Sequence, residues 1–103
     1  GSSGKAFSED QVDRAVQVLQ PIAPRYPDAL RSVNVEGTVI LRFVVGANGR
    51  VEPGSIEVVS TSHRLFAESV KSALLNTRFR PAAAGGHEVR QLVGQGFGFK
   101  LNK

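Results

Sequence analysis

Residues 36–60, with the sequence EGTVILRFVVGANGRVEPGSIEVVS, decide the fold of this chain. In the first half of this stretch, apolar side chains recur at every second position, at Val39, Leu41, Phe43 and Val45. A period of two in β-branched and aromatic residues is typical of a strand with one buried face. The stretch therefore predicts a strand that packs one face against a core.

A turn and a return strand follow in the same stretch. Gly46–Gly49 reads Gly-Ala-Asn-Gly, and Asn-Gly accepts positive φ at both of its positions, which predicts a tight antiparallel hairpin. The return strand carries Val51 and, further on, Ile56 and Val58. Pro53-Gly54 interrupts it and predicts a bulge or a short excursion. Because a two-stranded hairpin is only marginally stable alone, other segments must supply a third strand and cover the apolar face of the sheet.

A short helix is expected before the hairpin, over Pro27–Ser32. Proline suits the first helical position, and Asp28 lies in the first turn, where the helix dipole favours a carboxylate. Three apolar side chains are expected to face the sheet: Ala29, Leu30 and Val33.

The main helix is expected over Ser62–Thr77, with Ser62 as its N-cap. One apolar stripe runs along it at helical spacing, formed by Phe66, Val70, Ala73, Leu74 and Thr77. Pro81 prevents any continuation of the helix, and Phe79 is expected to lie under the sheet.

The last strand is expected over Glu88–Leu101, after a loop of small residues at 82–86. Apolar side chains share one parity of this strand, and the other parity carries glycine at positions 94, 96 and 98. Glycine is unfavourable in strands. Either a neighbouring element needs the room, or the strand forms a flat edge that the backbone of another chain can approach.

The N-terminal segment allows two interpretations. Ser8–Gln11 fits a capping box and is followed by apolar residues at helical spacing, whereas prolines at 21, 24 and 27 favour an extended chain. We interpret residues 1–4 as an expression-tag remnant, residues 5–23 as an extended arm, and residues 24–103 as the domain. The predicted fold is α+β, with two helices packed on a three-stranded antiparallel sheet.

Composition argues against several functions. The 103 residues include no cysteine, which leaves no disulfide or thiolate site, and the net charge is +4. The arginines are scattered and form no basic stripe with stacking aromatics, so we expect no nucleic-acid binding. His63 and His87 lie apart, and the carboxylates are dispersed. We therefore expect no catalytic residues, no metal site and no cofactor. We also expect no signal peptide, and no apolar run is long enough to span a bilayer.

Several short motifs occur together in a recognisable order. They are Pro24-Arg25-Tyr26-Pro27, Glu36-Gly37, Arg42-Phe43-Val44-Val45, Asn48-Gly49-Arg50-Val51 and Arg78-Phe79-Arg80-Pro81. In this order and spacing the chain resembles the C-terminal domain of the TonB family, the energy transducers of the Gram-negative envelope. It departs from the family at Arg25, where glutamine is frequent, and at Thr77, where tryptophan is frequent.

The resemblance implies a location and partners. The domain would lie in the periplasm, and the full-length parent would be anchored to the inner membrane and driven there by a proton-motive complex. Its partners would be outer-membrane transporters, whose short TonB box adds as a strand to the edge of the last strand. The implied partner-binding residues are Arg25, Tyr26, Pro27, Val89, Arg90, Gln91, Leu92, Val93, Gly94, Gln95, Gly96, Phe97 and Gly98.

Other functions stay open at this point. A TolA-like or other envelope scaffold of the same fold would bind a different periplasmic partner. An open strand edge would also allow a strand-swapped homodimer.

Overall fold

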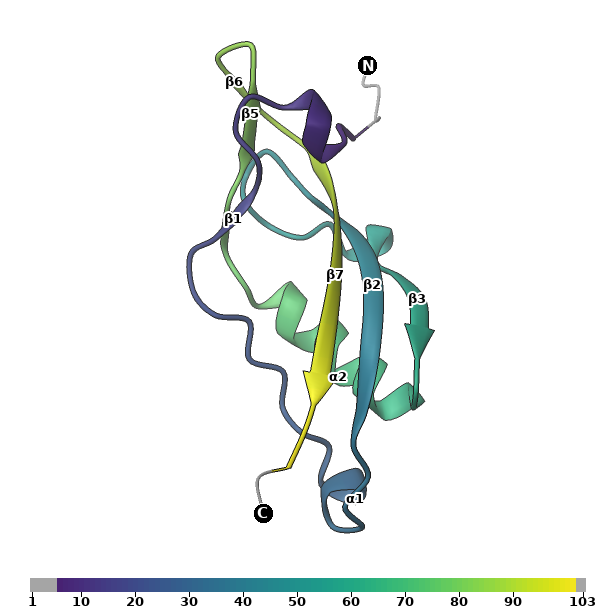
Figure 1. Cartoon of the computed structure of the whole chain (residues 1–103). Coiled ribbons are helices and arrows are strands. Elements are labelled where there is room, and N and C mark those ends of the chain that lie inside the picture. The colour runs from purple at the N-terminus through teal and green to yellow at the C-terminus, as the bar shows by residue number, and fades with distance from the viewer. Residues whose placement is uncertain (1–5, 102–103) are drawn as a thin grey trace.

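The computed structural model describes residues 6–101, so the residues interpreted as a tag remnant, 1–4, lie outside the described part. Figure 1 shows an elongated domain in which two long strands, β2 and β7, run side by side along the molecule. In chain order the elements are the 3-10 turn η1 (Glu9–Gln11), β1 (Gln17–Val18), α1 (Asp28–Arg31), β2 (Gly37–Val45), the 3-10 turn η2 (Pro53–Ser55), β3 (Glu57–Thr61), α2 (Arg64–Leu75), β4 (Phe79–Arg80), β5 (Ala82–Ala84), β6 (His87–Val89) and β7 (Gln91–Phe99).

The central sheet confirms the predicted fold. Its three strands are antiparallel and lie in the order β3-β2-β7. The register of β2 against β7 is unbroken from the pair Gly37 and Phe99 to the pair Val45 and Gln91. The alternating apolar side chains of β2 are fully buried, as the period of two predicted, at Val39, Leu41, Phe43 and Val45.

The hairpin turn differs in detail from the prediction. The N–H of Gly49 donates to the carbonyl of Gly46 at 2.9 Å, and Gly49 has φ +82°. Asn48 does not have positive φ, so the expectation of two left-handed residues is wrong. Because the loop holds one residue more than a two-residue hairpin, a single left-handed glycine suffices to redirect the chain. The predicted excursion at Pro53-Gly54 is confirmed as the 3-10 turn η2.

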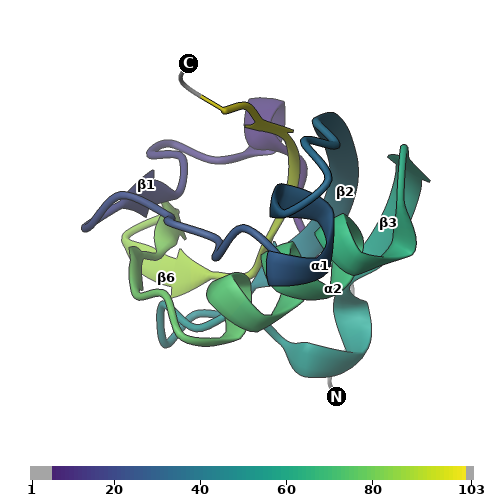
Figure 2. The ribbon, with the colours of Figure 1, turned by 90° about the horizontal axis from the view of Figure 1, so that it is seen from below.

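Helix α2 packs on one face of the sheet (Figure 2), whereas α1 lies beyond the end of the sheet in Figure 1 and adds Leu30 to the same core cluster. In α2 the side chains of Phe66, Val70 and Leu74 are buried, as the apolar stripe predicted. The predicted N-cap, Ser62, is wrong, since His63 caps α2 by accepting the Leu65 N–H on Nδ1 at 3.0 Å. The Ser62 hydroxyl oxygen instead accepts the N–H of Thr38 in β2 at 3.0 Å.

The short helix α1 buries less than expected. Pro27 is its N-cap, and Leu30 is buried at 6% exposure. Ala29 is exposed, and Val33, beyond the helix, is 63% exposed. A single helical turn directs only one of its side chains at the core, so the expectation that all three face the sheet is wrong.

The segment of small residues after α2 forms a hairpin. Strands β5 and β6 are antiparallel, and the turn between them has φ +60° at Gly85 and +80° at Gly86. The prediction of a loop at 82–86 is therefore wrong, because two successive left-handed glycines allow the alanine run to pair. Val89 belongs to β6 and pairs with Ala82, so the last strand begins at Gln91 rather than at Glu88.

The N-terminal arm is extended, which confirms that part of the fold prediction. The capping-box motif forms only the single turn η1, in which the Gln11 side chain accepts the Ser8 N–H at 2.9 Å. Beyond it, Arg14 pairs with Ala83 of β5, and β1 pairs with β4.

Candidate functional site

The candidate site is the outer edge of β7, the side turned away from β2. At one end of this edge the Leu92 N–H donates to the Phe7 carbonyl at 2.8 Å, and the Phe7 N–H donates to the Arg90 carbonyl at 2.9 Å. Because successive peptide groups in a strand point in opposite directions, the N–H and C=O groups of Gly94, Gly96 and Gly98 point outward as well. Within residues 6–101, no strand pairs with this side of β7 from Gly94 onward.

The glycine row on this strand is not explained by packing inside the domain. A Cβ added to Gly94 or Gly98 would meet no atom within 4 Å, and one added to Gly96 would meet only Ile40 and Val39 atoms, at 3.9 Å and 4.0 Å. Among the described residues, no neighbouring element needs the room. Of the two explanations raised by the sequence, the flat and accessible edge is the one the geometry favours.

A shallow apolar hollow adjoins the edge on the outer face of the sheet. Its volume is about 490 Å³, and it is lined by Ile40, Leu41, Arg42, Val59, Gly94, Gln95 and Gly96. Ile40 is 47% exposed and Val59 is 52% exposed. Apolar side chains of a strand added to β7 would find apolar surface here, across the bare glycines.

An aromatic cluster supports the other face at the C-terminal end of β7. The Phe66 ring stacks on Phe99 with a centroid distance of 4.4 Å. Tyr26 meets both rings edge-on, at 5.6 Å from Phe66 and 5.5 Å from Phe99. The predicted site residue Tyr26 therefore lies at one end of the strand, with Pro27 next to it in the chain. Arg25 is exposed and forms an ion pair with Asp28 at 3.4 Å.

An ion pair holds the other end of β7. Arg90 donates to both carboxylate oxygens of Glu52, from Nε at 2.6 Å and from Nη2 at 2.8 Å. These hydrogen bonds hold the pKa of the Glu52 carboxyl below its ordinary value. Gln91 is buried, and its side-chain oxygen accepts the Val16 N–H at 2.8 Å. Arg90 and Gln91 thus attach the start of β7 to the hairpin and to the arm.

The predicted partner-binding residues of the last strand differ in how far they are engaged within the domain. Val89 lies on β6, Arg90 and Gln91 are engaged within the domain, and the outward N–H of Leu92 is taken by Phe7. Gly94 to Gly98 form the open part of the edge. Phe7 is not among the predicted residues, since nothing in the pattern of an extended arm indicates which strand it will meet.

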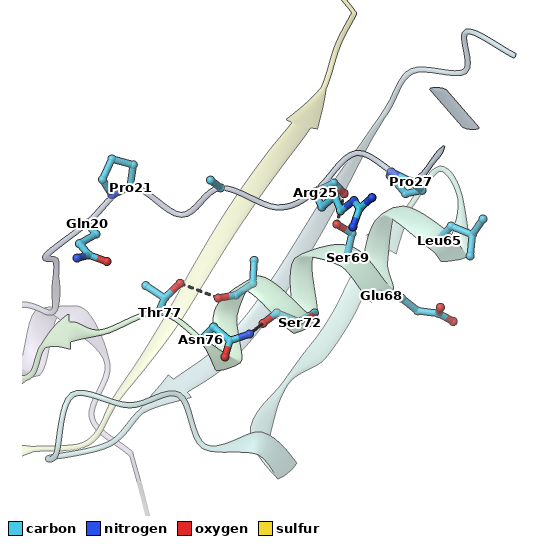
Figure 3. A pocket seen from close by; sticks show the side chains of 12 residues that line it. Gln20, Pro21, Arg25, Pro27, Leu65, Glu68, Ser69, Ser72, Asn76 and Thr77 are labelled. Carbon is cyan, nitrogen blue, oxygen red and sulfur yellow. Dashed lines mark hydrogen bonds between the residues drawn. The ribbon is translucent and has the colours of Figure 1, made fainter. Parts of the chain in front are cut away.

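A second concave site lies between the arm and α2 (Figure 3), and its volume is about 610 Å³. The polar groups on its floor are bonded to nearby backbone carbonyls. Thr77 donates to the carbonyl of Ala73 at 2.7 Å, Asn76 donates to that of Ser72 at 3.0 Å, and Ser69 donates to that of Arg25, just beyond the arm. These groups do not converge on a common point in the groove, so it carries no recognisable chemistry.

The described residues contain no cluster of three or more His, Cys, Asp or Glu side chains that could hold a metal ion. His63 caps α2, and His87 is exposed on β6. Over the same part of the chain, no helix combines the length and the apolar character needed to cross a bilayer.

The motifs that carry the family resemblance meet one another in the fold. The Phe79 N–H donates to the Gly49 carbonyl at 2.9 Å, which joins the hairpin turn to the segment after α2. Glu36, from the Glu-Gly motif, accepts the N–H of Leu101 just beyond β7 at 2.7 Å. Segments far apart in sequence are thus fixed together by these motifs.

The fold and the edge define a class, namely small α+β domains whose three-stranded antiparallel sheet ends in a largely unpaired strand. The chain belongs to the family described as "Gram-negative bacterial TonB protein C-terminal", whose sequence profile matches residues 22–101. The sequence resemblance is thereby confirmed.

Individual relatives agree with this assignment. The chain is 31% identical over 106 residues to Protein TonB of Pseudomonas aeruginosa, and it spans 30% of the length of that protein. The solution NMR structure of the Pseudomonas aeruginosa TonB C-terminal domain superposes with a TM-score of 0.75 at 29% identity, covering 93% of this chain and 94% of that one. A TonB2 structure from Vibrio anguillarum gives a TM-score of 0.60 at 25% identity, covering 100% of this chain and 97% of that one.

Proposed function

We propose that this chain is the periplasmic, partner-binding end of a TonB-type energy transducer. It binds the TonB box of an outer-membrane transporter as a strand added to the edge of β7. It acts by binding the transporter and transmitting force to it rather than by catalysis. The observation that carries this proposal is the row of outward backbone groups from Gly94 to Gly98, left unpaired within residues 6–101.

Backbone pairing suits such a task. Each of the three glycines offers one donor and one acceptor, and a main-chain hydrogen bond is worth roughly 0.5–1.5 kcal/mol net. Strand addition gains affinity from the main chain, so it tolerates variation in the guest sequence. A load applied along the strand is shared by several bonds, which suits a domain that transmits force from an inner-membrane complex coupled to the N-terminal part of its parent.

The surroundings of the edge support the same function. Large apolar side chains of a guest strand can cover bare glycines in a sheet, and here they would lie against Ile40 in the hollow of the outer face. The net charge of +4 favours approach to acidic segments around a transporter, by steering that weakens as salt rises.

The test is an NMR titration of the ¹⁵N-labelled chain with a TonB-box peptide. The amides of Gly94, Gly96 and Gly98 are expected to shift first. Gly96→Pro removes an outward N–H without touching the bonds to β2, since proline is tolerated where the N–H of an edge strand faces solvent. It should weaken peptide binding about tenfold or more, because a bond is lost and a ring blocks the edge.

Gly96→Ala is the matched control, because it keeps the N–H and has room for its methyl group. It should bind the peptide within about twofold of the unsubstituted chain. Shifts confined to α2 and the arm, or equal binding by the proline variant, would contradict strand addition. If the chain captures no transporter in pull-downs from outer-membrane extracts, the envelope-scaffold alternative would be favoured instead.

A further inference from the structure

The edge of β7 is already partly occupied by the chain itself. Phe7 pairs with β7 in parallel orientation opposite Gln91, and its N–H and C=O groups bond to Arg90 and Leu92. Pairing ends there, because the chain leaves the extended conformation at Glu9 and forms the 3-10 turn η1. In Figure 1, η1 lies beside the upper end of β7. Phe7 therefore has the position that one residue of a guest strand would take.

The segment that carries Phe7 makes fewer hydrogen bonds to the rest of the domain than the part of the arm that follows it. Asp13 and Arg14 make three backbone hydrogen bonds with Ala83, between 2.8 and 3.1 Å. The Asp13 carboxylate also accepts the N–H of Gly85 at 2.9 Å, and Arg14 donates to the carbonyl of Pro81 at 2.8 Å. The arm can thus stay attached from Asp13 onward while the residues before it leave the edge.

The two backbone bonds of Phe7 are weak enough to be exchanged for a guest. Two net hydrogen bonds correspond to an equilibrium ratio of roughly five to one hundred and fifty in favour of the closed arrangement. A guest that makes the same two bonds, in addition to those at Gly94 to Gly98, can displace Phe7, and its affinity is lowered by the same equilibrium ratio. A guest that pairs only with Gly94 to Gly98 need not displace it.

We propose that residues 6–12 form a displaceable strap, which closes the Arg90–Leu92 end of the β7 edge against a guest strand. This inference rests on the function proposed above. A short guest binds over Gly94–Gly98 with the strap in place. A longer guest, which also pairs with Arg90 and Leu92, binds only as the strap leaves, so the strap lowers the affinity for long guests selectively.

The test uses the full chain and two acetylated, amidated peptides of alternating threonine and valine, each with one glutamate for solubility. One has five residues, about the length of Gly94–Gly98, and the other has nine, about the length of Arg90–Gly98. Phe7→Pro removes the donor to Arg90 and should raise affinity for the nine-residue peptide about tenfold, while the five-residue peptide should change less than about twofold. Ala6→Pro is the matched control, because it stiffens the same segment and keeps the N–H of Phe7.

A second readout follows the strap directly. In the peptide-free Phe7→Pro variant, the amide of Leu92 should lose protection from hydrogen exchange, whereas Ala6→Pro should retain it. Binding of both peptides at Gly94–Gly98 with no effect of Phe7→Pro would overturn the strap and leave the proposed function standing. No shift at Gly94–Gly98 with either peptide would overturn the proposed function, and the strap with it.

Discussion

At the scale of the residue, Gly37 shows how tertiary packing can dictate a single position. A Cβ at this residue would lie 2.0 Å from Oγ of Ser62 and 2.7 Å from the Phe66 ring. Ser62 cannot move aside without losing its bond to the Thr38 N–H, and Phe66 is fully buried. The glycine of the Glu-Gly motif is therefore required by the close approach of the α2 segment to β2.

We expect Gly37→Ala to destabilise the domain by about 1–3 kcal/mol, since the added methyl group overpacks a site whose neighbours are fixed. Urea unfolding followed by circular dichroism measures this change. Gly98→Ala is the control in the neighbouring strand, where a Cβ meets nothing within 4 Å. It should leave stability unchanged or raise it by up to about 1 kcal/mol, because alanine restricts the unfolded chain. Equal losses in both variants would show that the packing at Gly37 is not the cause.

At the scale of the element, β7 has two unlike sides. Its odd-numbered residues from Gln91 to Phe99 face the odd-numbered residues of β2 in an unbroken register. Its even-numbered residues direct their backbone groups outward, where Phe7 meets Leu92 and no strand of the described chain meets the three glycines. One side of β7 is therefore fixed to the sheet, while the other side leaves the backbone groups of the three glycines open.

Hydrogen exchange should follow this alternation. The amides of Val93, Gln95 and Phe97 are expected to exchange slowly, because they face β2. Those of Gly94, Gly96 and Gly98 are expected to exchange at least about tenfold faster, since they face solvent. NMR measurement of these amide exchange rates at low protein concentration tests the prediction. Slow exchange at the glycines that disappears on dilution would reveal a strand-paired homodimer instead of an open edge.

At the scale of the whole molecule, an aromatic cluster unites the parts of an elongated domain. The domain measures 49 × 23 × 21 Å, and its long axis follows the central strands (Figure 1). Tyr26 comes from the segment between the arm and α1, Phe66 from α2 and Phe99 from β7, and their rings are in mutual contact. The segment that joins the arm to α1 is thereby part of the core, although it contains no helix or strand.

The chain has one tyrosine and no tryptophan, so Tyr26 reports on this cluster alone. We expect tyrosine fluorescence and far-ultraviolet circular dichroism to give the same urea midpoint, because the cluster couples the arm to the sheet in one cooperative unit. Phe99→Leu should lower both midpoints together. A fluorescence transition at lower urea than the dichroism transition would show that the arm unfolds separately.

Much of this architecture follows from local pattern. The period of two in β2, the helical stripe of α2 and the excursion at Pro53-Gly54 were all predictable, because strand and helix periodicity express which face is buried. The position of the candidate edge on the last strand came from the order and spacing of the family motifs. The period, the stripe and the excursion are each contained within a short stretch of sequence, whereas the family motifs extend from Pro24 to Pro81.

The sequence by itself thus determined the sheet, the main helix, the family and the strand that carries the edge. Only the tertiary structure decided that His63 rather than Ser62 caps α2, that the alanine run pairs with β6, and that Phe7 occupies one end of β7. The physical reason is the same in each case. Ser62 bonds to Thr38, the alanines pair with β6 and Arg14, and Phe7 bonds to Arg90 and Leu92. Most of these partners are distant in the chain, and no periodicity records which distant backbone group will satisfy a given donor or acceptor.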